Sequence, residues 1–282
     1  MRKALSLATA AVVSLALTVN IAAATPQRYS ASLQTPGTSR TLTLPPSADH
    51  APVISLGTAV DPGSGQMVEG YAIVRYRNGK AKPGGRAARA PACYGFLAKG
   101  AKWKAVEPWV VNAANTRGLV DTFVLDNLAG DIAKWEDGAD GVLGSGAGVN
   151  ILGDGTPTTT TLLADTVSPD NVNEVYFADV ADTDVIAVTI VWGIFSGPTF
   201  NRRLVEWDQV YDDVDFNWSA VGAAGAMDFE SLATHELGHS VGLNDQYDPT
   251  CNAATMYGYA SEGETNKRTL EAPDVTGVSV LY

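Results

Sequence analysis

The sequence predicts an α+β fold, in which one sheet packs against a few helices. Three strand-like segments follow one another along the chain: 173–180, 184–192 and 203–211. The middle one contains Val185 to Trp192, is apolar on both faces, and should therefore lie in the centre of a sheet. Helical spacing of apolar residues marks three other segments: 119–135, the stretch from Asp228 to Gly242, and 269–282.

The N-terminal third is expected to precede the main domain. Residues 1–24 have the basic start, apolar run and small residues of a secretory signal peptide. Residues 25–92 hold two strand-like segments, 53–56 and 69–76, followed by a basic linker rich in Gly and Pro, 77–91. This region suits a propeptide; the alternative is a small accessory hairpin that stays attached. The main domain is then expected to span 93–282.

The first half of that domain should contain a strand, a helix and a loop. Residues 103–112 suit a strand that begins or lies at an edge, because Pro108 cannot donate to a neighbour. The helix 119–135 leads into a loop rich in Gly and Asp, 136–155. The loop lacks EF-hand spacing, so calcium is possible there but a solvent-exposed loop is the simpler interpretation. For the acidic run at 208–215, a solvated turn is favoured over a metal site.

The pattern His235-Glu236-Leu237-Gly238-His239 is organised for metal chemistry. Four residues on a helix rise about 6 Å and return to the same face, so His235 and His239 can bind one zinc ion. Glu236 is placed to reach a water molecule as a general base. The plainer alternative is a buried helix whose two histidines are hydrogen-bonded core residues.

The residues after this helix supply a third ligand. Gly242 lies where a helix ends and the chain turns back, a position that favours a residue tolerant of positive φ. Asp245, three residues later, offers a carboxylate, and catalytic zinc sites use three protein ligands.

The full pattern H-E-x-x-H-x-x-G-x-x-D resembles the signature of the metzincin metalloproteases, with Asp245 where most members have histidine. Snapalysins, a bacterial branch, use aspartate there. Met256 is well placed to be the methionine of the Met-turn that metzincins carry beneath the zinc; the alternative is a methionine that only fills the core. The ending D-x-x-G-x-x-x-L-Y is similar to the closing helix of matrixins. The resemblance implies a metzincin-type domain, with a twisted, mostly parallel sheet of about five strands, an active-site helix and a C-terminal helix.

Cys93 and Cys251 are expected to form one disulfide, because an exported chain with two cysteines most simply pairs them. The rival interpretation starts from Pro91-Ala92-Cys93-Tyr94-Gly95, which loosely resembles the matrixin cysteine switch, in which a propeptide thiolate fills the open zinc position. Cys251 would then be unpaired.

Taken together, the sequence predicts a secreted, monomeric zinc metalloendopeptidase with protein or peptide substrates. Only three histidines are present, so a single catalytic zinc is expected. The formal net charge of −12 argues against nucleic acid and anionic membranes as partners. Two alternatives remain: a zinc hydrolase of a non-peptide bond, and a non-catalytic binding or adhesion protein on a metzincin scaffold.

Overall fold

The computed structural model describes residues 40–282 except 48, 78, 85–91 and 147. The chain divides into two compact units, Met1–Leu33 and Gln34–Tyr282. The first unit, the expected signal peptide and the start of the expected leader lie outside the described residues. The boundary expected before Cys93 falls inside the second unit.

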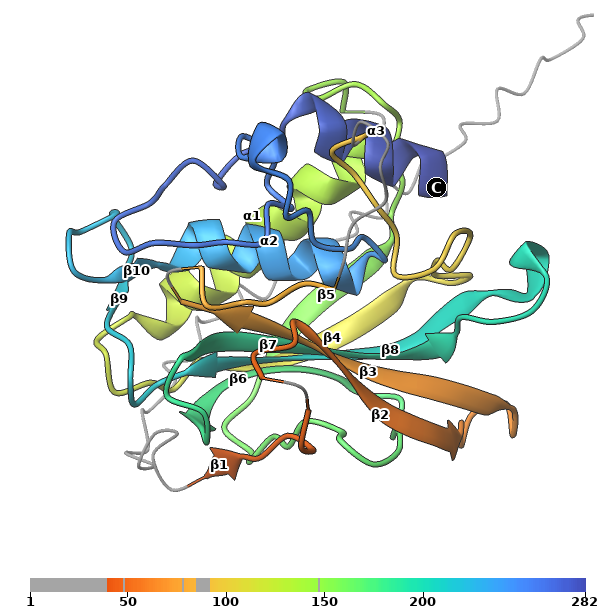
Figure 1. Cartoon of the computed structure of the whole chain (residues 1–282), viewed down its shortest axis with the longest axis horizontal. Coiled ribbons are helices and arrows are strands. Elements are labelled where there is room, and N and C mark those ends of the chain that lie inside the picture. Colours follow the sequence, from red (N-terminus) through yellow and green to blue (C-terminus); the bar gives the residue numbers. More distant parts are fainter. Residues whose placement is uncertain (1–39, 48, 78, 85–91, 147) are drawn as a thin grey trace, which may run out of the picture. The chain divides into compact units, whose positions relative to one another are not determined.

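One large sheet dominates the second unit, with strand order β2-β3-β7-β8-β6-β4-β5 (Figure 1). Its strands are β2 (Val53–Val60), β3 (Met67–Tyr76), β4 (Glu107–Asn112), β5 (Leu152–Pro157), β6 (Asn173–Val180), β7 (Val185–Ile194) and β8 (Arg203–Asp212). A short β1 (Thr41–Leu42) pairs with the end of β6. From β5 through β8 the neighbours run parallel, whereas β7 is antiparallel to β8. These five strands match the expected sheet, and the β2–β3 hairpin extends it beyond β7.

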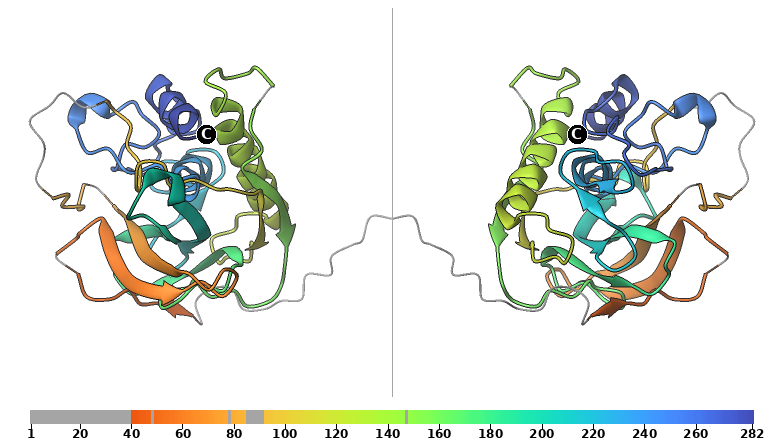
Figure 2. Two further views of the ribbon diagram at one scale, coloured as in Figure 1. Left: turned by 90° about the vertical axis from the view of Figure 1, so that its right-hand side faces the viewer. Right: turned by 90° about the vertical axis from the view of Figure 1, so that its left-hand side faces the viewer.

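Three helices cover one face of this sheet (Figures 1 and 2). They are α1 (Asp121–Gly138), α2 (Phe229–Ser240) and α3 (Ala272–Leu281). In α1 the predicted apolar stripe is buried at Val124, Leu128, Ile132 and Trp135, a spacing of three or four residues. The described residues also form two short 3-10 turns, η2 (Thr199–Asn201) and η3 (Pro249–Cys251). A separate two-stranded sheet pairs β9 (Trp218–Ser219) with β10 (Met227–Asp228).

Hydrophobic cores form on both faces of the sheet. The larger lies under the helices and includes Trp109, Trp135 and Phe229. The smaller, which includes Tyr176 and Trp192, is built from the sheet's other face. No helix in the described part of the chain is long and apolar enough to cross a membrane.

The predicted centre of the sheet is confirmed, since β7 is buried over all but its last residue and paired along both edges. Strand β5 was not predicted, because it ends a segment that the sequence assigns to a loop. Its residues, Leu-Gly-Asp-Gly-Thr-Pro, have low strand propensity. Pairing with β4 imposes the extended conformation on them.

The prediction of a solvated turn for the acidic run is wrong for three of its four members: Asp208, Asp212 and Asp213 are buried, and only Asp215 is exposed. Burial is tolerated because backbone N–H groups hydrogen-bond these carboxylates. Asp212 accepts from Val180 N at 2.9 Å, and Asp213 accepts from Thr116 N at 2.8 Å.

Candidate metal site

Helix α2 presents His235 and His239 to one point. Its N-cap is Asp228, whose carboxylate accepts from Ser231 N at 3.0 Å and so satisfies a free amide of the first turn. One helical turn separates the two histidines, and their ring centroids lie 4.9 Å apart with the planes at 85°. Both side chains are almost completely buried.

Backbone carbonyls orient both imidazoles in the same way. His235 Nδ1 lies 2.6 Å from Thr255 O, and His239 Nδ1 lies 3.0 Å from Leu243 O. A carbonyl oxygen only accepts, so Nδ1 is the donor and Nε2 of a neutral ring keeps its lone pair. Burial, followed by the charge of Arg75, lowers the pKa of His235 to about 3, which keeps this imidazole in the neutral form that binds metal ions.

The turn after α2 brings Asp245 back to the histidines. Gly242 has a φ of 104°, and a Cβ atom there would lie 2.9 Å from Ala101 O. Asp245 Oδ1 consequently reaches 3.0 Å from His235 Nε2 and 3.7 Å from His239 Nε2. The other carboxylate oxygen accepts from the hydroxyl of Tyr247 at 2.7 Å, which fixes the side chain.

These three side chains fit a metal ion. Their ligand atoms all lie within 4.8 Å of one another. His235 Nε2 and Asp245 Oδ1 are buried and have no hydrogen-bond partner. With the proton of His235 on Nδ1, two lone-pair atoms face each other at 3.0 Å, an arrangement that a cation between them would stabilise. Two imidazole nitrogens and one carboxylate form a ligand set suited to zinc.

The charges around Asp245 favour its ionised form. Burial alone would raise the pKa of Asp245, but His239, His235 and Arg75 together hold it well below its usual range. Asp245 is thus an anion beside neutral His235, as metal ligation requires.

Glu236 lies beside the first histidine and points towards β7. The hydroxyl of Thr189 donates to Glu236 Oε2 at 2.6 Å, while Oε1 is buried without a partner. Burial raises the pKa of Glu236, which increases its basicity. One oxygen of this carboxylate is therefore held and the other is available to accept a proton.

Met256 packs beneath the site. A Cβ atom at position 238 would lie 2.2 Å from Met256 Sδ, so only glycine lets the methionine approach the helix between the two histidines. Asp274 in α3 accepts from Thr255 N at 2.8 Å and from Met256 N at 3.1 Å. The closing helix thus holds the turn whose Thr255 carbonyl orients His235.

The two cysteines are joined by a disulfide, with their Cα atoms 5.1 Å apart. Cys93 is therefore not a free thiol in this structure, and Cys251 is its partner, as the simpler expectation has it. In the loop expected at 136–155, Asp137 accepts from Gly144 N and Gly146 N. Among the described residues, no group of possible metal ligands draws on that loop.

Sequence reasoning missed four residues that support the site: Arg75, Thr189, Tyr247 and Asp274. Asp274 had a local signal, because it forms a capping box with Glu271 at the start of α3. The other three had none, since strand pairing or the return of a loop places them. Arg75 comes from β3, and its Nη1 lies 3.6 Å from Asp245 Oδ1.

Comparisons with known proteins agree with this geometry. Residues 170–282, which contain β6 through α3, match the family model described as Matrixin. The chain is also 36% identical over 70 residues to human matrilysin (Homo sapiens), a stretch that covers 25% of this chain and 25% of that protein. The aligned part thus spans about a quarter of the relative's length. Residues 170–282 are therefore similar to matrixins, and the α+β fold agrees with that likeness.

Proposed function

We propose that this matrixin-like metzincin is a secreted zinc-dependent endopeptidase. The observation that carries the proposal is the convergence of ligand atoms from His235, His239 and Asp245, in which His235 Nε2 and Asp245 Oδ1 are buried without a hydrogen-bond partner, as is Oε1 of the adjacent Glu236. A buried general base next to a metal-binding group has a clear use in hydrolysis and none in a structural metal site.

His235, His239 and Asp245 would hold the ion. The chemistry that zinc supplies at such a site is polarisation of the scissile carbonyl group and a lowered pKa for the attacking water molecule. The carbonyls of Thr255 and Leu243 keep both imidazoles in the ligating tautomer, and Tyr247 keeps the carboxylate of Asp245 in place.

Glu236 would move the protons. Its Oε1 takes a proton from water as the oxygen attacks the peptide carbonyl, and the same carboxyl group then delivers a proton to the leaving amine. The hydroxyl of Thr189 holds Oε2, so that Oε1 is the atom that faces the reaction. Substrates would be proteins or peptides, because residues 170–282 match the model of a peptidase family.

The secreted location rests on the signal peptide expected at residues 1–24. A monomer without nucleic-acid or membrane partners is consistent with the acidic net charge. Of the two alternatives, a non-catalytic scaffold has no use for the oriented carboxylate of Glu236. A hydrolase of a non-peptide bond would use the same residues, and only substrate tests separate it from a protease.

Zinc content gives the first test. The purified chain should hold about one zinc ion, measured by elemental analysis, and 1,10-phenanthroline should abolish peptide hydrolysis, since the ion supplies the Lewis acid. Hydrolysis at full rate by metal-free protein would contradict the proposal. Cleavage of esters but not of a peptide library would favour the non-peptide alternative.

Glu236→Gln separates the base from the ligands. The amide has the same size but cannot take a proton, so turnover should fall by roughly 10²–10⁴-fold while zinc content stays unchanged. Turnover is measured with a fluorogenic peptide and zinc by elemental analysis. Glu262→Gln, a change at an exposed glutamate, is the matched control. Near-normal proteolysis by Glu236→Gln would show that another group is the base.

A further inference from the structure

Strand β3 fills the sheet edge that passes the candidate site. Thr189 of β7, which donates to Glu236, pairs with Ile73 of β3. The pairing between β3 and β7 continues without a break from Glu69 to Arg75. Figure 1 shows β3 lying alongside β7 beneath α2. No extended peptide can add to this edge of β7 while β3 is there.

The same segment is also held from its other side. Arg75 Nη2 donates to Tyr257 O at 3.0 Å, and its contact with Tyr259 O is 3.4 Å. Two residues later, Arg77 forms a parallel bridge with Ala260. Residues 75–77 therefore lie between β7 and the chain that follows Met256, as a peptide bound across the site would, whereas residues 67–73 pair with β2 on the side away from β7.

The intact chain gives a large substrate no access to the base. The exposed fractions of His235, Glu236 and His239 are 0%, 1% and 1%. Hydrolysis of a protein requires an extended segment to reach the free oxygen of Glu236, so some part of the structure must leave. The segment that already lies in the position of an added strand is the simplest one to remove.

The hairpin is held in part by contacts that are easily lost. Arg75 is buried, its Nε and Nη1 have no hydrogen-bond partner, and only the ion pair of Nη1 with Asp245 Oδ1 at 3.6 Å offsets the loss of water around the guanidinium group. Asp184, at the start of β7, receives Arg77 at 3.6 Å and Lys80 at 3.4 Å, and both cations are about half exposed. Such exposed pairs contribute little and are screened by salt.

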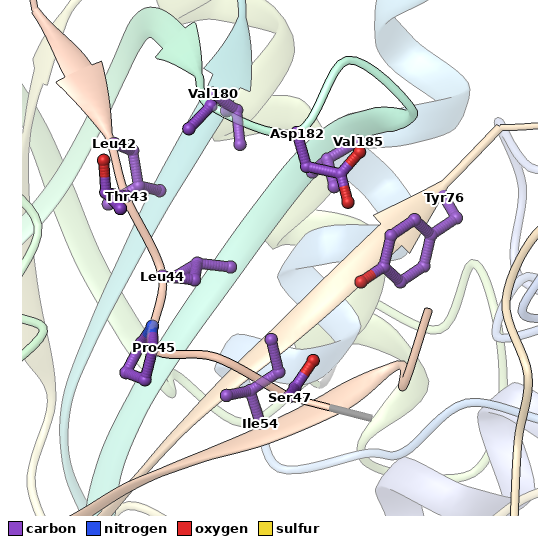
Figure 3. Close-up of a pocket in the computed structure, with 11 residues that line it drawn as sticks. Leu42, Thr43, Leu44, Pro45, Ser47, Ile54, Tyr76, Val180, Asp182 and Val185 are labelled. Carbon is purple, nitrogen blue, oxygen red and sulfur yellow. The ribbon is translucent and has the colours of Figure 1, made fainter. Parts of the chain in front are cut away.

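On the face away from the helices, the N-terminal segment leaves a cavity of about 280 Å³. Figure 3 shows Leu42 to Pro45 along one side of it and Tyr76, Asp182 and Val185 along the other, with Val180 at the top and Ile54 and Ser47 at the bottom.

We propose that residues 67–77 occupy the peptide-binding edge of β7 as an internal substrate-like segment, and that the chain stays latent until the β2–β3 hairpin leaves. This inference rests on the proposed function. Hydrolysis by a protease of one peptide bond in the linker 77–91, with water as the co-reactant, would cut the tether. The hairpin would then be held only by non-covalent contacts, and a substrate could replace it.

The test is a cut made at a chosen place in the folded chain. A recognition sequence for a specific protease replaces residues 85–91, the zinc-loaded protein is cut, and the N-terminal fragment is removed by gel filtration. A tethered segment has an effective concentration in the millimolar range. Its removal should therefore raise hydrolysis of a micromolar peptide about 100-fold. Hydrogen exchange in residues 185–191 should become faster, with zinc content unchanged.

Arg75→Met gives a second, independent measurement. Loss of the guanidinium contacts should raise the activity of the uncut chain several-fold. After cutting and fragment removal, the variant should match the wild type, because residue 75 has left. Arg202→Met, at a half-buried arginine that donates to Lys99 O and Gly197 O, is the control and should change the activity of neither the cut nor the uncut chain.

Each contrary result overturns a different statement. Equal activity before and after removal of the fragment, with zinc bound, would refute the latency. Loss of zinc or unfolding on removal would show that the hairpin is part of the site. Bound zinc, a freely exchanging β7 and no hydrolysis of any peptide would instead refute the proposed function.

Discussion

Each face of the sheet carries a buried acidic group, and the two groups differ in their neighbours. On the helix-covered face, Asp245 lies among two imidazoles and the guanidinium of Arg75. On the other face, Glu206 is completely buried, and its carboxylate lies close to those of Asp165 and Asp170. Side chains alternate along β8, so Gln209, which bonds Ser240 of α2, faces the helices whereas Glu206 faces away.

The titration of the two groups is opposite although both are buried. Burial, followed by the charges of Asp208 and Asp165, raises the pKa of Glu206 to about 10. Burial also opposes ionisation of Asp245, yet its cationic and imidazole neighbours hold the pKa of Asp245 well below its usual range. The neighbours, and not the depth of burial, decide whether a buried carboxyl group is an anion.

This difference explains why only one group suits zinc. Around Asp245, imidazole nitrogens supply the donors that zinc prefers, and the carboxylate is already ionised. The Glu206 group has only oxygen donors and holds a proton at neutral pH. These carboxyl groups bind either a proton or, in its place, a hard cation such as Ca²⁺, which prefers oxygen ligands.

The largest effect is expected from Asp245→Asn, which removes the anion and keeps the shape. Loss of a residue that only hydrogen-bonds a metal ligand typically lowers metal affinity roughly 10–100-fold. Loss of a ligand should lower zinc affinity by at least that much, and activity should fall with it. Competition with a chelator measures the affinity. Asp248→Asn is the control, because Asp248 caps η3 and should leave zinc binding unchanged. If Asp248→Asn loses zinc and Asp245→Asn keeps it, the third ligand has been misassigned.

A smaller effect is expected from Thr189→Val. The pKa of Glu236 is raised by burial, as that of Glu206 is, but Glu236 lies beside the two histidines. The hydroxyl of Thr189 orients its carboxylate by a hydrogen bond. Without that hydrogen bond, turnover should fall about 10-fold while zinc affinity is unchanged. Steady-state kinetics on the released enzyme, together with a zinc titration, would check this. A loss of zinc with no separate loss of turnover would assign Thr189 to packing alone.

The smallest effect concerns stability and pH at Glu206. Its pKa is raised from 4.5 to about 10, so between these values the folded chain holds a proton that the unfolded chain has released. The free energy of unfolding should therefore fall as pH rises through this window. Glu206→Gln should flatten the slope by at most about 1.4 kcal/mol per pH unit.

Urea unfolding between about pH 5 and pH 9, compared with the exposed control Glu262→Gln, measures this slope. An unchanged slope in Glu206→Gln would mean that the proton lies elsewhere in the cluster. If added Ca²⁺ makes the wild-type chain more stable at high pH and Glu206→Gln abolishes that gain, a cation occupies the group in place of the proton.

Elements with a strong local pattern were predictable. Strands β6, β7 and β8 and the helices α1 and α3 lie within a few residues of their expected bounds, because the side-chain period alone distinguishes a helix from a strand. Strand β5 was missed because its Gly, Asp and Pro residues give no such pattern. The prediction of a solvated turn at 208–215 was wrong because a run of acidic residues normally indicates exposure to solvent. The backbone N–H groups that hydrogen-bond these buried carboxylates cannot be identified from the sequence.

The sequence by itself determined which residues are candidates for the site. His235, Glu236 and His239 share one helical turn, and Asp245 follows a glycine that permits the return of the chain, so spacing and the family resemblance together named all four. Only the tertiary structure decided what surrounds them. Thr189 and Arg75 reach the site through strand pairing between residues far apart in the chain, and no local period encodes such contacts. Tyr247 is only two residues from Asp245, but the conformation of the loop decides whether their side chains meet. The position of β3 along the edge of β7, beside Glu236, is likewise a matter of strand order in the sheet, and no local pattern in the sequence indicates it.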